Sequence, residues 1–139
     1  MLTNKNKKTV LVAGTFDLIH PGHLNFFKQA KKLGDKLFII VARDQTVVKV
    51  KGVWPKYNER TRLRNIKRLG LADRALLGQL NDPFKTAIKL NPDIIALGYD
   101  QKTFTEGLAQ ELAKRFCYPK IVRLKAFKPE QYKSSKLKG

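Results

Sequence analysis

The chain has 139 residues, 42% of them hydrophobic, which suits one domain with a real core. Lys and Arg total 29 against 11 acidic residues, and the resulting net charge of +18 favours anionic partners such as phosphates. The lysines are scattered along the sequence as on a solvated surface, so nucleic-acid binding is not the expected function.

The single cysteine, Cys117, excludes an intrachain disulfide, and we expect a reducing cytoplasm as the compartment. Because no metal-ligand residue accompanies Cys117, we expect it to be a small buried apolar side chain. The apolar run that follows residues 1–8 is too short for a signal sequence or a membrane span. We therefore expect no membrane association, a basic N-terminal extension over residues 1–8 and one folded domain over residues 9–139.

The first predicted elements are a strand, a helix and a second strand. Residues 9–13 and 37–42 are short, β-branched apolar runs, typical of strands buried on both faces. Between them, apolar residues recur at helical spacing before the stop signal Gly34: Leu24, Phe26, Phe27, Ala30 and Leu33. This β-α-β order implies a right-handed crossover and parallel pairing.

After the second strand the pattern breaks into a predicted loop over residues 45–57, which contains several lysines. Asn58 is a candidate N-cap for a helix that ends at Gly70 and turns Leu63, Ile66 and Leu69 inward. Residues 74–78 predict a third strand. Asp82-Pro83 then opens a helix whose inward residues are Phe84, Ala87, Ile88 and Leu90.

The last predicted elements are a strand over residues 93–98, a helix and a strand over residues 121–124. The residues expected to line that helix are Leu108, Leu112, Ala113 and Phe116. The tail from residue 125 has no clear apolar period, and we expect it to form a loop or a short helix. Five strands alternating with helices predict a single α/β domain with a Rossmann-like, doubly wound, parallel five-stranded sheet.

Both histidines of the chain lie in the turn between the first strand and the first helix. His20 and His23 are three residues apart and can share one helix face, at a helix end that attracts anions. Imidazole N–H groups there can stabilise negative charge in a nucleotidyl-transfer transition state, and Gly22 allows a substrate to approach the backbone. The alternatives are a zinc site, for which no nearby ligand set is present, and a Pro-Gly turn with two surface histidines.

The segment Gly14-Thr15-Phe16-Asp17, followed by His20-Pro21-Gly22-His23, resembles the signature of the cytidylyltransferase-like nucleotidyltransferases. The similarity continues through residues 41–44, 51–52, 58–62, 75–78 and 92–101. Together these segments are more similar to the small archaeal FAD synthases than to the glycerol-3-phosphate cytidylyltransferases. The resemblance implies transfer of AMP from ATP to the phosphate of FMN, with Mg²⁺ and release of pyrophosphate.

Carried onto this sequence, the resemblance gives the histidine turn the central role. His20 and His23 would stabilise the transferring α-phosphoryl group, and Thr15, Phe16 and Gly22 would contact the nucleotide beside it.

Three further positions would surround the phosphates. Lys51 would cover the triphosphate from a mobile loop, or be a solvated loop lysine. Arg62 would reach the β- and γ-phosphates, although Arg60 and Arg64 are close enough to leave the choice open.

Asp17 and Asp44 would lie near the acceptor or the metal, or cap the turns that follow them.

The base and ribose would be framed by Gly98, Tyr99, Asp100 and Gln101, with a helix N-cap as the alternative role for Asp100. If the first and fourth strands are neighbours, this segment and the histidine turn share one crevice. Ser134 and Ser135 resemble the hydroxyl cluster of the family, which opens a last helix and binds phosphate, but Lys136 follows them at once.

A flavin acceptor needs a flat apolar slot, for which Phe16, Trp54, Tyr57 and Phe127 are candidates, each of which could equally belong to the core. We also expect a homodimer. The alternative enzyme is a cytidylyltransferase that uses CTP and glycerol 3-phosphate or a similar phospho-alcohol. The alternative from another class is a non-catalytic nucleotide- or RNA-binding module, for which no RNA-recognition signature is present.

Overall fold

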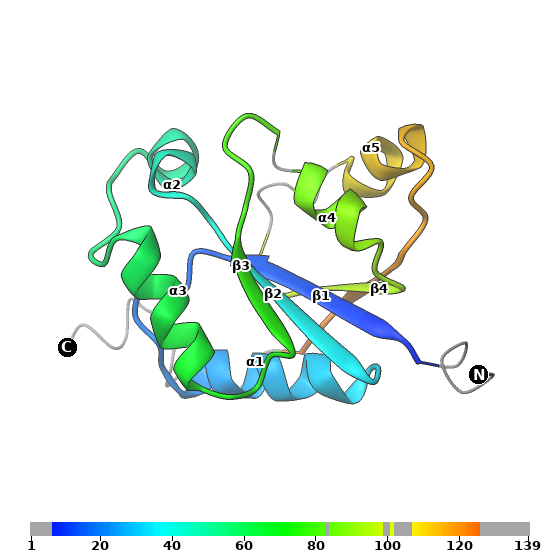
Figure 1. The fold of residues 1–139 in the computed structure, drawn as a ribbon, viewed down its shortest axis with the longest axis horizontal. Coiled ribbons are helices and arrows are strands. Elements are labelled where there is room, and N and C mark those ends of the chain that lie inside the picture. The colour runs from blue at the N-terminus through cyan, green and yellow to red at the C-terminus, as the bar shows by residue number, and fades with distance from the viewer. Residues whose placement is uncertain (1–6, 83, 99–100, 102–106, 126–139) are drawn as a thin grey trace.

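The computed structural model describes residues 7–82, 84–98, 101 and 107–125. Five parallel strands form one sheet in the order β3-β2-β1-β4-β5, and helices cover both faces (Figure 1). The predicted α/β class and the doubly wound sheet are confirmed. β1 pairs with β2 on one side and with β4 on the other, so the order of strands switches at β1.

Every predicted strand is present, with ends shifted by a residue or so. The strands are β1 (Thr9–Gly14), β2 (Lys36–Val41), β3 (Arg74–Leu77), β4 (Ile94–Leu97) and β5 (Lys120–Arg123). The helices are α1 (Pro21–Lys32), α2 (Asp44–Lys51), α3 (Glu59–Arg68), α4 (Lys85–Leu90) and α5 (Leu108–Lys114).

The prediction of a continuous loop over residues 45–57 is wrong, because α2 occupies its first half. The helix has Asp44 in its first turn and ends at Gly52, whose φ of 80° is the left-handed conformation that glycine adopts without strain. Among its residues only Val47 is buried. A helix that buries one side chain leaves almost no apolar period in the sequence.

Two further predictions about helices are corrected. Phe116 does not line α5; it lies beyond the end of that helix with a φ of 63° and an exposed side chain. Cys117 next to it is buried instead, as expected, and burial raises the pKa of its thiol. The fourth helix begins at Lys85 rather than at the Asp-Pro pair, and Asp82 accepts a hydrogen bond from the Phe84 N–H just before it.

The core consists of two apolar layers, one on each face of the sheet. On one face Phe27 and Ala30 of α1 and Ile66 of α3 pack with the strands, and on the other Ala87 of α4 and Leu112 of α5 do so. Figure 1 shows α1 and α3 below the sheet and α4 and α5 above it. The two layers hold β1 at the centre, with Val10, Leu11 and Val12 all buried.

None of the helices in the described part of the chain is both long and apolar enough to cross a membrane.

Candidate active site

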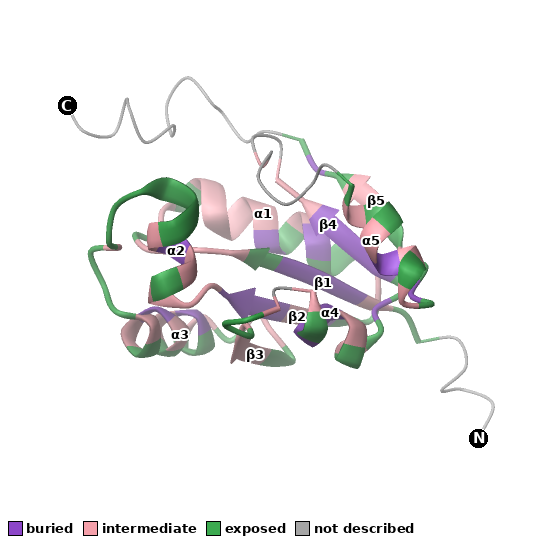
Figure 2. Cartoon of the chain, turned by 90° about the horizontal axis from the view of Figure 1, so that it is seen from above, coloured by how far each residue is buried: buried purple, intermediate pink, exposed green. Residues whose placement is uncertain are grey.

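The carboxyl ends of β1 and β4 meet where the strand order switches, which is the place where open α/β sheets bind ligands. Gln101 joins the two ends: its side chain accepts the Gly98 N–H at 2.7 Å and donates to the Ala13 carbonyl at 2.8 Å. Ala13 is exposed although the three residues before it in β1 are buried, and Figure 2 shows the tip of this central strand in the colour of exposed residues. The two turns therefore border a common open surface.

Arg123 of β5 supports the β4 side of this surface. Its guanidinium donates to the Gly98 carbonyl at 2.7 Å and to the Gln101 carbonyl at 2.9 Å. The predicted base-binding segment is thus represented by Gly98 and Gln101, whose polar groups hold the backbone together. Tyr99 and Asp100 lie outside the described residues.

The two histidines form the start of α1, with His20 as the N-cap and His23 three residues later. His20 Nδ1 accepts the Gly22 N–H at 3.0 Å, and His23 Nδ1 accepts the His20 N–H at 3.3 Å. Ser, Thr, Asp or Asn usually fills this capping role. A neutral imidazole whose Nδ1 accepts a hydrogen bond carries its proton on Nε2, so the cap fixes one tautomer in both rings.

The rings of this pair are stacked, with centroids 3.9 Å apart and planes 28° from parallel. Pro21 at the first helical position presets the backbone of the same turn. The helix end thus holds two oriented N–H donors where its own dipole favours an anion.

The ring of Phe16 packs against the ring of His23. Its ring meets His23 edge-on at 5.8 Å and Phe27 at 5.0 Å, and its side chain is buried. Its φ of 51° is uncommon for a bulky residue, and such strain persists only where the surroundings enforce it. Gly14 makes room for the ring, because a Cβ there would lie 2.7 Å from Phe16 Cζ.

The side chain of Arg62 is fully buried, which differs from the expectation that it reaches the phosphates. It donates to the Tyr57 carbonyl at 2.9 Å, to the Thr15 carbonyl at 2.9 Å and to Asp44 Oδ1 at 2.6 Å. It therefore connects the histidine turn, the start of α2 and the loop before α3. Arg60 and Arg64, the alternatives on the same helix, are exposed.

The two aspartates predicted near the acceptor or metal also bind protein groups. Asp17 accepts the N–H groups of Lys56 at 2.6 Å and Tyr57 at 2.8 Å, and Asp44 pairs with Arg62. These partners lie 39 and 40 positions from Asp17 and 18 positions from Asp44, so the contacts are not caps of the turns that follow the two aspartates. Lys51 is exposed at the end of α2 rather than on a loop.

Two residues of this network carry no role in the sequence-based prediction. Glu59 accepts the Asp44 N–H at 2.8 Å and pairs with Arg43 at 2.9 Å, and Arg43 also donates to the Gly78 carbonyl. Both lie in segments on which the family resemblance rests. Their partners are 15 or more positions away, so no local spacing indicates these contacts.

The remaining predicted positions divide into two groups. Ser134, Ser135 and Phe127 lie outside the described residues. The other three candidates for the flat apolar slot of a flavin lie within the described residues. Phe16 is buried in the core, whereas Trp54 and Tyr57 are exposed on the loop between α2 and α3.

The described residues contain no group of three or more His, Cys, Asp or Glu side chains that could hold a metal ion. Asp17 and Asp44, the aspartates predicted near the acceptor or the metal, accept hydrogen bonds from protein groups. Within the part of the chain that the structure describes, the side chains therefore do not fit an all-protein Mg²⁺ site. In proteins Mg²⁺ usually keeps several waters and is bound through one or two carboxylates together with substrate phosphates.

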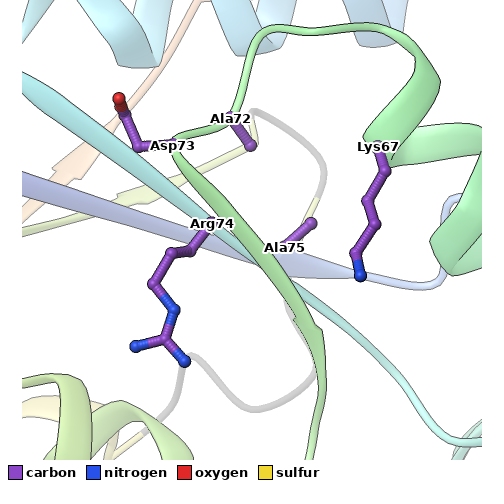
Figure 3. Close-up of a pocket in the computed structure, with 5 residues that line it drawn as sticks. All are labelled: Lys67, Ala72, Asp73, Arg74 and Ala75. Atoms are coloured by element: carbon purple, nitrogen blue, oxygen red, sulfur yellow. The ribbon is translucent and has the colours of Figure 1, made fainter.

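A shallow pocket lies at the other edge of the sheet, at the amino end of β3. Figure 3 shows Lys67 and Arg74 on either side of the strand, with Ala72, Asp73 and Ala75 completing the lining. Asp73 accepts the Leu37 N–H there, a contact that joins β2 and β3. Parallel α/β sheets bind ligands at the carboxyl ends of their strands, whereas this pocket lies at an amino end. We therefore do not assign it to the candidate active site.

Comparison with known proteins shows the family to which the chain is similar. The family model described as cytidylyltransferase-like matches residues 11–139. The FAD synthase of Methanosarcina barkeri is 50% identical over 116 residues, which are 83% of this chain and 81% of that protein. The FAD synthase of Archaeoglobus profundus is 47% identical over 127 residues, covering 91% of this chain and 80% of that protein.

Solved structures share the fold. A protein from Thermoplasma volcanium, described as a lipopolysaccharide core biosynthesis protein, superimposes with a TM-score of 0.81 and 42% identity, over 87% of this chain and 98% of that one. Pantoate-beta-alanine ligase from Francisella tularensis superimposes with a TM-score of 0.59 and 14% identity, over 96% of this chain and 69% of that one. The second likeness concerns the fold alone.

Proposed function

Since the chain belongs to the cytidylyltransferase-like family, we propose that it is a nucleotidyltransferase that transfers AMP from ATP to FMN and so forms FAD and pyrophosphate. The observation that carries the chemistry is the stacked pair His20 and His23, oriented by the start of α1 at the switch point of the sheet. The choice of FMN as acceptor is supported by FAD synthases that are about half identical to this chain.

In the proposed reaction a phosphate oxygen of FMN attacks the α-phosphorus of ATP. A new P–O bond forms in line with the bond to the β-phosphate, which breaks, and pyrophosphate leaves with that bond's electrons. No protein nucleophile is needed, because the acceptor is itself a phosphate. The protein contributes position and charge neutralisation.

His20 and His23 donate their Nε2–H groups to oxygens of the transferring phosphoryl group in this proposal. Their orientation is set before substrate arrives, because Nδ1 of each ring is bonded to the backbone of the same turn. Donors held in advance need no reorganisation as charge develops. Thr15 and Gly22 supply the backbone along which the phosphates lie.

We assign the contacts with the triphosphate to exposed cations on α2 and α3. Lys51, at the end of α2, covers the triphosphate, and Arg60 or Arg64 reaches the β- and γ-phosphates from α3. Arg62, which is enclosed, is proposed as a positioning residue: it keeps the Thr15 carbonyl, Asp44 and the Tyr57 carbonyl together.

The nucleotide base and ribose are proposed to lie on the β4 side, at Gly98 to Gln101, with Ser134 and Ser135 as further phosphate contacts. Asp17 and Asp44 organise the acceptor side through their bonds to Lys56, Tyr57 and Arg62. ATP is proposed to enter as its Mg²⁺ complex, with the metal counted as part of the substrate.

We further propose a cytoplasmic location, a homodimer, and a folded domain over residues 9–139 preceded by a basic extension. The lone buried cysteine fits a reducing compartment. Light scattering of the purified chain measures the oligomeric state directly.

The function is tested by incubating the protein with Mg²⁺ and each pairing of ATP or CTP with FMN or glycerol 3-phosphate, while pyrophosphate release is followed. FAD and pyrophosphate should form from ATP and FMN. Turnover of CTP and glycerol 3-phosphate alone would overturn the choice of substrates, and salt-sensitive RNA retention without any pyrophosphate release would favour a binding module.

A further inference from the structure

Exposed apolar residues lie in the histidine turn and in the loop that is hydrogen-bonded to it, and the chemistry above does not use their side chains. Leu18 in that turn exposes 55% of its surface, and Val53 and Trp54 in the loop between α2 and α3 expose 64% and 66%. Tyr57 in the same loop is also exposed. We call these four residues the apolar patch. Large apolar side chains that remain exposed together are typical of a surface that binds a ligand or another macromolecule.

The patch is tied to the histidine turn by hydrogen bonds. Asp17, next to Leu18, holds the N–H groups of Lys56 and Tyr57, and the buried Arg62 holds the Tyr57 carbonyl and the Thr15 carbonyl. Figure 2 shows the loop between α2 and α3 as almost entirely exposed. The loop is thus exposed while its backbone is held at Lys56 and Tyr57, which reduces the entropy lost on binding a ligand.

The strand order places the apolar patch on one particular side of the histidine turn. The histidine turn follows β1, the loop of the patch comes after β2, and Gly98 follows β4; β2 and β4 are the two neighbours of β1. A ligand on the patch therefore approaches the histidines from the β2 side. A nucleotide base at Gly98 and Gln101 lies on the β4 side, so the two substrates do not compete for the same side of the histidine turn.

The chemistry and size of the patch favour a planar ring that carries a phosphate. The exposed cation Lys56 lies two positions after Trp54 in the chain, so apolar surface and positive charge adjoin. Indole offers a flat face for stacking. A stable protein interface uses roughly 20–30 residues on each side, far more than one loop and one turn present here.

We propose that Trp54, with Val53 next to it in the loop and Leu18 in the adjoining histidine turn, is the surface on which the planar ring of the acceptor stacks. The inference rests on the proposed function, under which that ring is the flavin of FMN, and it adds the residues that select the acceptor. Phe16 is not available for this contact because its ring is buried against Phe27 and His23.

The first test is steady-state FAD formation by the full chain, with FMN varied at saturating ATP and then the reverse. Trp54→Ala should raise the KM for FMN roughly five- to 150-fold, the range found when an aromatic stacking partner is removed, and leave the KM for ATP unchanged. Trp54→Phe should recover most of the loss. The matched control is Tyr118→Ala, an aromatic that is 74% exposed before β5 at the other edge of the sheet, and it should behave as wild type.

The second test measures binding without turnover. Trp54 is the only tryptophan of the chain, so intrinsic tryptophan emission reports on this residue alone. FMN should quench that emission saturably, and the emission of the bound flavin should be quenched less in Trp54→Ala than in wild type. Circular dichroism should show both variants folded, because the side chain is mostly exposed.

The outcomes separate the two proposals. A wild-type chain that forms no FAD contradicts the proposed function. A wild type that forms FAD, with an unchanged KM for FMN in Trp54→Ala or an equal rise in both KM values, overturns only the stacking surface. A change in oligomeric mass in Trp54→Ala with no change in the KM for FMN would also overturn it, by assigning the patch to a second copy of the chain.

Discussion

Replacing Arg62 by alanine tests the network that holds the site together. The change removes hydrogen bonds from two carbonyl oxygens and separates the ion pair with Asp44, all around a guanidinium with no exposed surface. Breaking one partner of a buried ion pair costs about 3–5 kcal/mol. Asp44 keeps 22% of its side chain exposed, so water partly replaces the lost partner and we expect about 3 kcal/mol, the lower end of this range.

In a thermal melt that loss should lower Tm by about 10 °C, and the protein should stay folded at room temperature because domains of this size have about 5–15 kcal/mol of stability. Arg62→Lys should fall between alanine and wild type, since one ammonium cannot match a planar fork that serves several acceptors. Arg64→Ala, an exposed change on the same helix, should alter stability by less than about 0.5 kcal/mol.

The assay is differential scanning fluorimetry or circular dichroism, combined with the KM for ATP measured well below Tm. An Arg62→Ala protein with an unchanged Tm and a raised KM for ATP would refute the reasoning. It would return Arg62 to the role of a phosphate contact.

Three further predictions concern the histidine turn and one ion pair. His23→Ala should lower kcat far more than the affinity for ATP, because the imidazole acts on charge that develops in the transition state; equal losses in both would count against that role. Gly14→Ala should destabilise the protein by about 1–3 kcal/mol and lower kcat, because the new Cβ displaces the Phe16 ring, and an unchanged Tm in a thermal melt would contradict the close contact. The hydrogen bond from Arg115 lowers the pKa of the Asp82 carboxyl below its ordinary value of 3.8, so this contribution to stability is present above that value and is lost as pH falls through the folded pKa. The difference in Tm between wild type and Asp82→Asn should therefore shrink on acidification, and a difference that stays constant down to about pH 2 would exclude the linkage.

The sheet could be predicted because its central strands are continuous apolar runs buried on both faces. α2 could not, since it buries only Val47 and its other positions are polar or exposed enough to leave no period. Phe116 shows the opposite error: an apolar residue continued the spacing of α5 past the point where the helix ends.

The candidate site also has one part that the sequence predicts and one part that it does not. The histidine turn was predictable because its residues are close in sequence and their spacing alone places them at one helix end. The enclosure of Arg62 was not, because its acceptor on Thr15 lies 47 positions away and its contact with Asp44 depends on how α2 and α3 meet. An exposed arginine and a buried one look alike in a sequence, and only the tertiary contacts distinguish a phosphate ligand from a positioning residue.

The central claim is that AMP itself moves from ATP to FMN. The most direct measurement follows ATP labelled at the α-phosphorus, incubated with FMN, Mg²⁺ and the wild-type chain, with FAD separated and pyrophosphate quantified. The label should appear in FAD in a one-to-one ratio with pyrophosphate. Pyrophosphate release with no label in FAD, or pyrophosphate release only when CTP and glycerol 3-phosphate replace the two substrates, would contradict the claim.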